Sequence, residues 1–257
     1  SVIDAALVGI SRLIAVLGDS YIESLMNPYG STLQGRLPAL LPGAPTVYNF
    51  GIAGSALPDY LGLASLVTRD FEVEKLVVLV GEGDYVEAFQ PPPGHFTWGE
   101  APGSAPRLLP DVRRDALRRF VRSLALVRYV RGNLRLTTAA LFKSRPSHVV
   151  STCEPETLRP GDTPRIQAYV DRLPAAWGLQ PRDVVLLFDD ESARQRLYGP
   201  SPTTPRERAS CPTRDSLALG QLAARARAAG MHVVELAPLF EAAWRQSGRR
   251  LDHSPLD

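Results

Sequence analysis

Residues 13–20 read LIAVLGDS, five apolar residues followed at once by Gly-Asp-Ser. Five consecutive apolar residues are enough for a buried strand, and a helical pattern begins directly after them. Gly18 suits a tight turn because a side chain there would obstruct the bend. The turn places Ser20 at the carboxyl-terminal edge of a sheet, near free helix N–H groups, where open α/β sheets bind ligands. The alternative is a simple helix N-cap, since Asp and Ser are both preferred there.

The rest of the chain alternates between short apolar runs and helical patterns. Strands are predicted for the apolar runs Thr46–Asn49, Leu76–Val80, Asp183–Phe188 and His232–Leu236, in addition to Leu13–Leu17. Helices are predicted between them, at Ser31–Leu41, Pro58–Val67, Asp111–Phe142, Pro164–Trp177 and Asp215–Ala229. This alternation predicts an α/β fold with a parallel sheet and helices on both faces.

The 257 residues are compatible with one large domain, 1–257, that carries an insertion at about 87–163. The insertion begins with a Pro- and Gly-rich surface loop, Gln90–Pro110, and continues into an Arg-rich helix. That helix presents either a solvated face or a docking surface for an anionic partner. The aromatic residues of the loop either wall a sugar site or have no such role; they are Phe89, His95, Phe96 and Trp98.

Composition excludes several classes of function. The net charge of +2 gives no reason to expect nucleic acid as a partner, and no apolar run approaches a bilayer-spanning length. The four histidines lack metal-binding spacing, and no GxGxxG loop is present, so neither a metal nor another cofactor is predicted. Cys153 and Cys211 form either one disulfide or two separate thiols.

Residues 48–54, after the second predicted strand, read YNFGIAG. Together with Gly-Asp-Ser, this stretch resembles the SGNH hydrolase family, whose first two blocks are Gly-Asp-Ser and N-x-G-x-x-G. The resemblance implies a three-layer α/β/α sandwich with a flavodoxin-like parallel sheet of five strands, in the order 2-1-3-4-5. It also makes Ser20 the nucleophile, with an oxyanion hole formed by the backbone N–H groups of Ser20 and Gly54.

The third block departs from the family pattern. Residues 78–84 read VLVGEGD where the family has Gly-x-Asn-Asp. In strict register Gly83 replaces the oxyanion Asn and Asp84 matches the following Asp. Against relatives that read Glu-Gly-Asn-Asp, Asp84 itself takes the Asn position. Neither alignment supplies a side-chain amide, and an ionised Asp84 would repel an oxyanion unless burial raised its pKa.

The last block of the family holds an Asp and, two or three residues later, the His that activates the serine. Residues 251–257 read LDHSPLD, in which Asp252 and His253 are adjacent. The stretch before Asp257 resembles the approach to the family's Asp-Gly-His. We therefore expect Asp257 to be the orienting acid, with the His two residues further on. The competing assignment makes His253 the base, and a third interpretation leaves it an ordinary surface histidine.

The resemblance implies a serine-dependent acyl-ester hydrolase or O-acyltransferase. Its substrate would be an O-acetylated carbohydrate or a related ester, either a small molecule or a polysaccharide, and its location periplasmic or extracellular. The rival hypothesis is an SGNH-fold binding or scaffolding domain that has lost its catalytic machinery. The altered third block favours this rival, and the intact Gly-Asp-Ser containing Ser20 argues against it.

Overall fold

The computed structural model describes residues 13–25, 27–110, 156–198, 212–248 and 250. Two compact units make up the chain, one formed by Ser1–Leu109 with Pro155–Asp257 and the other by Pro110–Glu154. Apart from Pro110, every described residue belongs to the first unit. The Arg-rich stretch Asp111–Phe142, both cysteines, His253 and Asp257 lie outside the described residues. Within the described ranges, no helix has the length and apolar character needed to cross a membrane.

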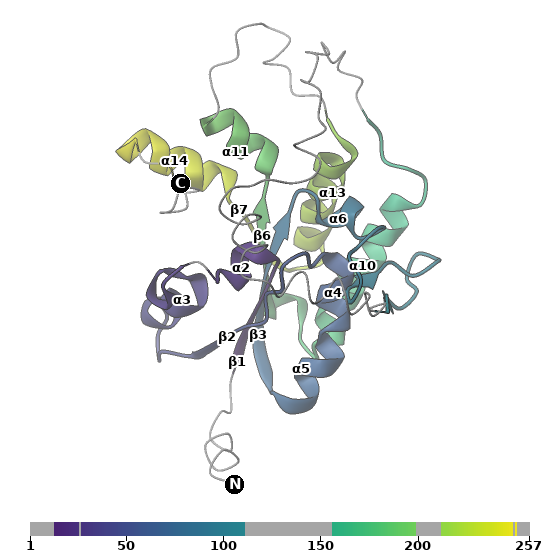
Figure 1. Ribbon diagram of the computed structural model, residues 1–257, viewed down its shortest axis with the longest axis horizontal. Helices are drawn as coiled ribbons and strands as arrows, with labels where there is room; N and C mark the ends of the chain where they lie inside the picture. The colour runs from purple at the N-terminus through teal and green to yellow at the C-terminus, as the bar shows by residue number, and fades with distance from the viewer. Residues whose placement is uncertain (1–12, 26, 111–155, 199–211, 249, 251–257) are drawn as a thin grey trace, which may run out of the picture. The chain divides into compact units, whose positions relative to one another are not determined.

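A five-stranded parallel sheet forms the centre of the first unit (Figure 1). Its strands are β1 (Leu13–Leu17), β2 (Thr46–Asn49), β3 (Val73–Gly81), β6 (Val184–Asp189) and β7 (His232–Glu235). They lie in the order β2-β1-β3-β6-β7, and every neighbouring pair is parallel. The predicted order 2-1-3-4-5 is therefore confirmed, with β6 and β7 as the fourth and fifth strands of the sheet.

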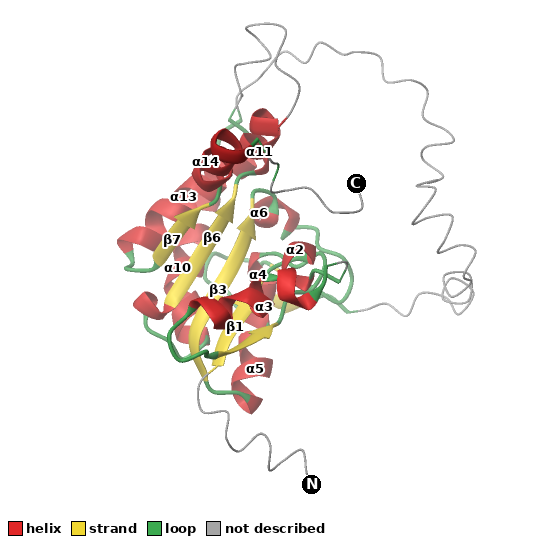
Figure 2. Cartoon of the chain, turned by 90° about the vertical axis from the view of Figure 1, so that its left-hand side faces the viewer, coloured by secondary structure: helices red, strands yellow, loops and turns green. Residues whose placement is uncertain are grey.

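Alternate residues of the strands face two different helix layers, as the two-residue period of a strand requires. Ala15 and Leu17 join the larger core, which packs against α4 (Leu57–Gly62), α5 (Ala64–Asp70), α10 (Asp162–Ala176) and α13 (Arg214–Ala228). Ile14 and Val16 face the other way, toward α3 (Leu33–Leu40). Figure 2 shows α3 and α10 on opposite faces of the sheet. The fold is the predicted three-layer α/β/α sandwich.

Several elements differ from the prediction. The expected helix Pro58–Val67 is divided into α4 and α5 at Leu63, directly after Gly62, against which the Phe96 ring is packed. The expected loop Gln90–Pro110 contains a small antiparallel ladder between β4 (Phe96–Thr97) and β5 (Arg107–Leu108). Tertiary contacts override local propensity here, because the Thr97 hydroxyl donates to the Ala88 carbonyl at 2.9 Å.

Further helices lie at the carboxyl-terminal edge of the sheet, toward which all five strands run. They are the single turns α2 (Ser20–Glu23) and α6 (Asp84–Glu87) and the longer helix α11 (Glu191–Tyr198), which was not predicted. The last helix, α14, spans Ala237–Ser247. In Figure 2 the arrowheads of β3 and β6 point toward α6 and α11. This edge holds the candidate site.

Candidate active site

Ser20 directly follows the turn at the end of β1. The turn residue Asp19 caps α2, because its Oδ1 accepts the Tyr21 N–H at 2.9 Å. A Cβ on Gly18 would lie 2.4 Å from Ile22 Cγ1, so the close approach of Ile22 requires glycine at this position. Ser20 itself is exposed. The turn thus presents a solvent-accessible hydroxyl at the carboxyl-terminal edge of the sheet.

The loop that follows β2 is hydrogen-bonded to this turn at three points. Phe50 N–H donates to the Val16 carbonyl at 2.8 Å, Ile52 N–H to the Gly18 carbonyl at 3.1 Å, and Ala53 N–H to Glu23 Oε2 at 3.0 Å. These bonds hold the backbone that leads into Gly54 beside α2.

The glycines and the asparagine of this loop have distinct structural roles. Asn49 fixes the loop further, since its Nδ2 donates to the Ile22 carbonyl and its Oδ1 accepts the Gly51 N–H, both at 2.7 Å. Gly54 has φ +84°, a left-handed conformation that favours glycine. Neither Ser20 N–H nor Gly54 N–H finds a hydrogen-bond acceptor among the described residues. Both groups are therefore free to bind an anionic oxygen.

Asp84 begins α6, three residues after the end of β3. Only 5% of Asp84 is exposed. Its Oδ2 accepts the Tyr60 hydroxyl at 3.0 Å and the Gly81 N–H at 3.2 Å. Burial raises the pKa of Asp84 well above its ordinary value of 3.8, and the nearby charge of Asp19 raises it further. The raised pKa favours the neutral carboxyl group, and its proton belongs on Oδ1 because Oδ2 already accepts two donors.

A cavity of about 90 Å³ opens where β1, β3 and β6 end. Burial raises the pKa of Asp19 and of Asp189, although the positive charge of Arg194 opposes the shift in both. Arg194 Nη1 lies 2.8 Å from Asp189 Oδ2. In the described part of the chain, no group of three or more His, Cys, Asp or Glu is arranged to hold a metal ion. The charged residues of the wall are Asp19, Glu82, Asp84, Glu87, Asp189, Glu191 and Arg194.

A histidine and a carboxylate meet beside Gly54, although they are far apart in the sequence. His95 Nδ1 lies 3.4 Å from Asp59 Oδ1. The closest approach of the ring to Gly54 is through Cε1 and Nε2, each 3.8 Å from where a Cβ of Gly54 would stand. Of the aromatic residues in this loop, Phe96 packs on Gly62 and Trp98 on Tyr169.

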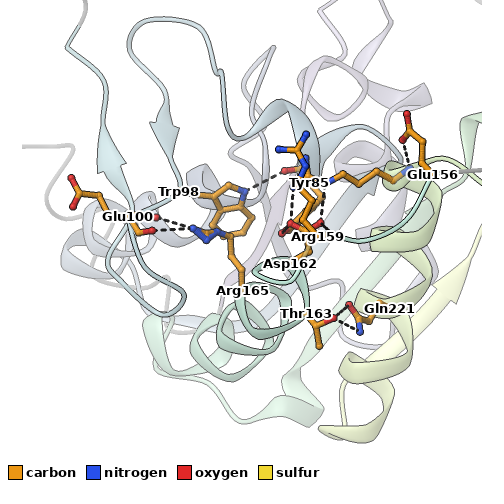
Figure 3. A network of polar contacts seen from close by, with 11 residues as sticks. Tyr85, Trp98, Glu100, Glu156, Arg159, Asp162, Thr163, Arg165 and Gln221 are labelled. Carbon is orange, nitrogen blue, oxygen red and sulfur yellow. Dashed lines mark hydrogen bonds and ion pairs between the residues drawn. The ribbon is translucent and has the colours of Figure 1, made fainter.

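A polar network fastens α6 and the segment after β4 to helix α10 (Figure 3). Asp162 accepts the Tyr85 hydroxyl at 2.8 Å and two bonds from Arg214, at 2.6 and 2.8 Å. The Trp98 indole N–H donates to the Tyr85 carbonyl at 3.2 Å, and Arg165 donates to the Gly99 and Glu100 carbonyls. Because Tyr85 follows Asp84 directly, this network holds the backbone beside that buried carboxyl group.

No family model matches the chain, and no curated protein matches it. Among solved structures it is similar to AlinE4, described as an SGNH-hydrolase family esterase, at 13% identity and TM-score 0.42, covering 96% of this chain and 86% of that one. It is also similar to a point mutant of AlinE4, at 11% identity and TM-score 0.43, with the same coverage of both chains. A third similar structure is LAE5, described as an alpha/beta hydrolase enzyme from the metagenome of Lake Arreo, Spain. Its identity is 12% and its TM-score 0.43, and the match covers 91% of this chain and 81% of that one.

The assignment of the fold rests on the chain's own topology. Five parallel strands lie in the order β2-β1-β3-β6-β7, and Gly-Asp-Ser follows the first of them. The N-x-G-x-x-G loop follows β2 and is bonded to the turn that carries Ser20. The chain has an SGNH hydrolase-like fold.

Proposed function

We propose that this protein is a serine-dependent acyl-ester hydrolase or O-acyltransferase that acts on an O-acetylated carbohydrate or a related ester. One observation carries the proposal: main-chain hydrogen bonds join the Gly54 loop to β1 and to Gly18, two residues before the exposed Ser20. The backbone N–H groups of Ser20 and Gly54 both lack an acceptor in the described part of the chain. Uncommitted N–H groups beside an accessible hydroxyl are what the tetrahedral intermediate of acyl transfer needs.

In the proposed reaction, the Ser20 hydroxyl oxygen attacks the ester carbonyl while a histidine takes its proton. The carbonyl oxygen becomes an oxyanion between the N–H groups of Ser20 and Gly54. Collapse of the intermediate expels the alcohol and leaves an acyl-serine, which water or an acceptor hydroxyl then resolves. The resemblance assigns the orienting acid to Asp257, and the competing assignment makes His253 the base; both residues lie outside the described part of the chain.

Asp84 supplies the third donor of the oxyanion hole in this proposal. A neutral carboxyl group carries one O–H, which can donate where the family's Asn would use its amide. The burial of Asp84 and the raised pKa that results support this role. An ionised carboxylate would instead repel the developing negative charge. A donor of this kind is worth about 3–4 kcal/mol of transition-state stabilisation.

The second candidate is a binding or scaffolding domain without catalysis. It is favoured by one observation: among the described residues, no imidazole contacts the Ser20 hydroxyl. Such a domain would still present the cavity at the ends of β1, β3 and β6, and would bind a ligand there without cleaving it.

Covalent labelling and acetate release distinguish the two candidates. The full-length protein should react once with a fluorophosphonate probe at Ser20, detected by mass spectrometry, and should release acetate from small acetyl esters. Ser20→Ala should abolish both, because loss of a nucleophile typically costs several orders of magnitude in rate. Ser24→Ala is the matched control, since Ser24 terminates the same short helix. Equal acetate release by wild type and Ser20→Ala would refute the proposal, and release that requires a sugar acceptor would identify a transferase.

A further inference from the structure

His95 lies beside a buried carboxylate that does not need it as a partner. Asp59 is 4% exposed, and its two oxygens already accept backbone N–H groups at 2.9 Å: Oδ2 from Ala56 and Oδ1 from Phe96. The imidazole therefore adds little to the satisfaction of this buried carboxylate. The contact instead affects the imidazole, because its Nδ1 lies 3.4 Å from Asp59 Oδ1.

The contact also decides which ring nitrogen of His95 is available to a ligand. A proton on Nδ1 is attracted to the carboxylate, whereas a lone pair there would be repelled by it. In the neutral imidazole, Nε2 then carries the lone pair and acts as an acceptor. Nε2 finds no hydrogen-bond partner among the described residues, and the side chain keeps 14% of its surface exposed. It is thus an oriented acceptor that solvent can reach.

The ring stands next to the glycine that is expected to hold the oxyanion. Its Cε1 and Nε2 atoms lie nearest to Gly54, and Pro92 packs on the same side at 3.5 Å from where a Cβ would stand. The backbone of His95 is fixed as well, since its N–H donates to the Pro92 carbonyl at 3.2 Å and its carbonyl accepts the Leu109 N–H at 2.9 Å. Both the loop and the side-chain rotamer are therefore constrained, as a pre-organised binding group requires.

We propose that His95, oriented by Asp59, is a substrate-binding residue whose Nε2 accepts a hydrogen bond from a hydroxyl group of the substrate beside Gly54. An acceptor at this position selects ligands that carry a donor next to the ester, as a partly acetylated sugar does and a simple alkyl ester does not. The inference rests on the proposed function for the position of the ester. The binding of the sugar can nevertheless be measured without catalysis.

The first test measures binding in a background that cannot turn over. Ser20→Ala and Ser20→Ala/His95→Ala are titrated with methyl 6-O-acetyl-glucoside by ligand-observed NMR. The double variant should bind about tenfold more weakly, the usual loss for one hydrogen bond left without its partner. His232→Ala in the same background is the control, because His232 begins β7 and lies at the opposite edge of the sheet. Its affinity should not change. Equal affinity of the two titrated variants would overturn the inference.

The second test measures kinetics on the same sugar ester. His95→Ala should raise KM about tenfold with little effect on kcat, because the lost bond is made in the ground state and the transition state alike. His95→Gln should recover part of the loss, since its side-chain carbonyl can accept the same donor. Asp59→Asn should also raise KM, because it removes the carboxylate beside the ring and leaves one of the two backbone N–H groups of Ala56 and Phe96 without its acceptor. A fall in kcat as large as that of Ser20→Ala, with KM unchanged, would make His95 the base and overturn the binding role.

The two tests separate this inference from the proposed function. If the wild type neither labels at Ser20 nor releases acetate, but Ser20→Ala/His95→Ala still binds the sugar more weakly than Ser20→Ala, the inference stands and the hydrolase proposal fails. If Ser20 labels and acetate is released, but the removal of His95 leaves sugar binding unchanged, the hydrolase proposal stands and the inference fails.

Discussion

Replacement of Asp162 by Asn should destabilise the fold strongly at neutral pH and by about 1 kcal/mol less at pH 3. The Asp162 side chain is 3% exposed and that of Arg214 is 11% exposed, and the two form a bidentate pair (Figure 3). The Arg159 N–H, at 2.8 Å, and the Tyr85 hydroxyl also donate to this carboxylate. The Asp162→Asn substitution would keep the shape of the side chain but leave the Arg214 charge largely buried and unpaired, which typically costs about 3–5 kcal/mol.

The pH dependence follows from the pKa of the same group. Burial alone would raise the pKa of Asp162, but hydrogen bonds from Arg214, the Arg159 N–H and Tyr85 outweigh it and lower the pKa from 3.8 to about 2. At about 1.4 kcal/mol per pKa unit, this shift corresponds to about 2 kcal/mol of stability. Because the folded pKa is the lower one, this stability is fully present above pH 4–5 and is lost as the pH falls toward 2. About half should remain at pH 3.

Urea denaturation followed by circular dichroism, at pH 7 and at pH 3, measures both effects. The difference between wild type and Asp162→Asn should be smaller at pH 3 by about 1 kcal/mol. Asp70→Asn is the matched control, because the Arg69–Asp70 pair has the same chemistry on the surface, with side chains 70% and 55% exposed. That variant should not change stability measurably. An Asp162→Asn variant as stable as wild type at pH 7 would refute the reasoning.

Three further substitutions test the site. Asp84→Asn should keep ester hydrolysis, whereas Asp84→Ala should lose about a hundredfold in kcat; equal inactivity of both variants in a hydrolysis assay would contradict this. The raised pKa of Asp84 lowers the stability of the wild type, by up to about 1.4 kcal/mol per pH unit, as the pH rises above about 4, and Asp84→Asn should remove this loss. Gly54→Ala should lower the free energy of unfolding by about 1–2 kcal/mol, measured by thermal denaturation, because φ +84° strains a side chain; an unchanged stability would contradict this. Gly18→Ala should lower the free energy of unfolding, measured in urea, by about 1–3 kcal/mol. If the source is the 2.4 Å contact between the added Cβ and Ile22 Cγ1, Ile22→Ala should relieve that loss in the double variant.

Strand β1 could be predicted from the sequence because it is buried on both faces. Each residue from Leu13 to Leu17 is buried, and such a strand shows as an unbroken apolar run. Gly18 could be assigned to a turn for the same reason, since it interrupts that run. The predicted roles of Ser20, Gly54 and Asp84 depended on motif order along the chain, and they remain predictions until the assays are done.

The rest of the site depends on contacts between distant segments. Asp59 and His95 are 36 positions apart, and no local pattern brings a helix start and an irregular loop together. One signal was present: Asp59 is the third residue of the helix, a position from which an acidic side chain often caps the first turn, as its bond to the Ala56 N–H shows. Helix α11 was missed because its sequence, ESARQRLY, has too few apolar residues to show a helical stripe.

The charges at the sheet edge also bear on which acyl group the site can accept. Among the described residues, six carboxyl groups and one arginine line the cavity, and burial raises the pKa of Asp19, Asp84 and Asp189 together. Another negative charge in this cavity would add to the repulsion from Asp19, which, after burial, raises the pKa of Asp84. An ester with an anionic acyl group, such as succinate, would therefore bind at a cost that a neutral acetyl group does not incur. Ionisation of Asp84 would oppose the oxyanion of any ester in the same way. For the proposed function, the same electrostatics favour a neutral acyl group, which makes acetate release the appropriate assay for this site.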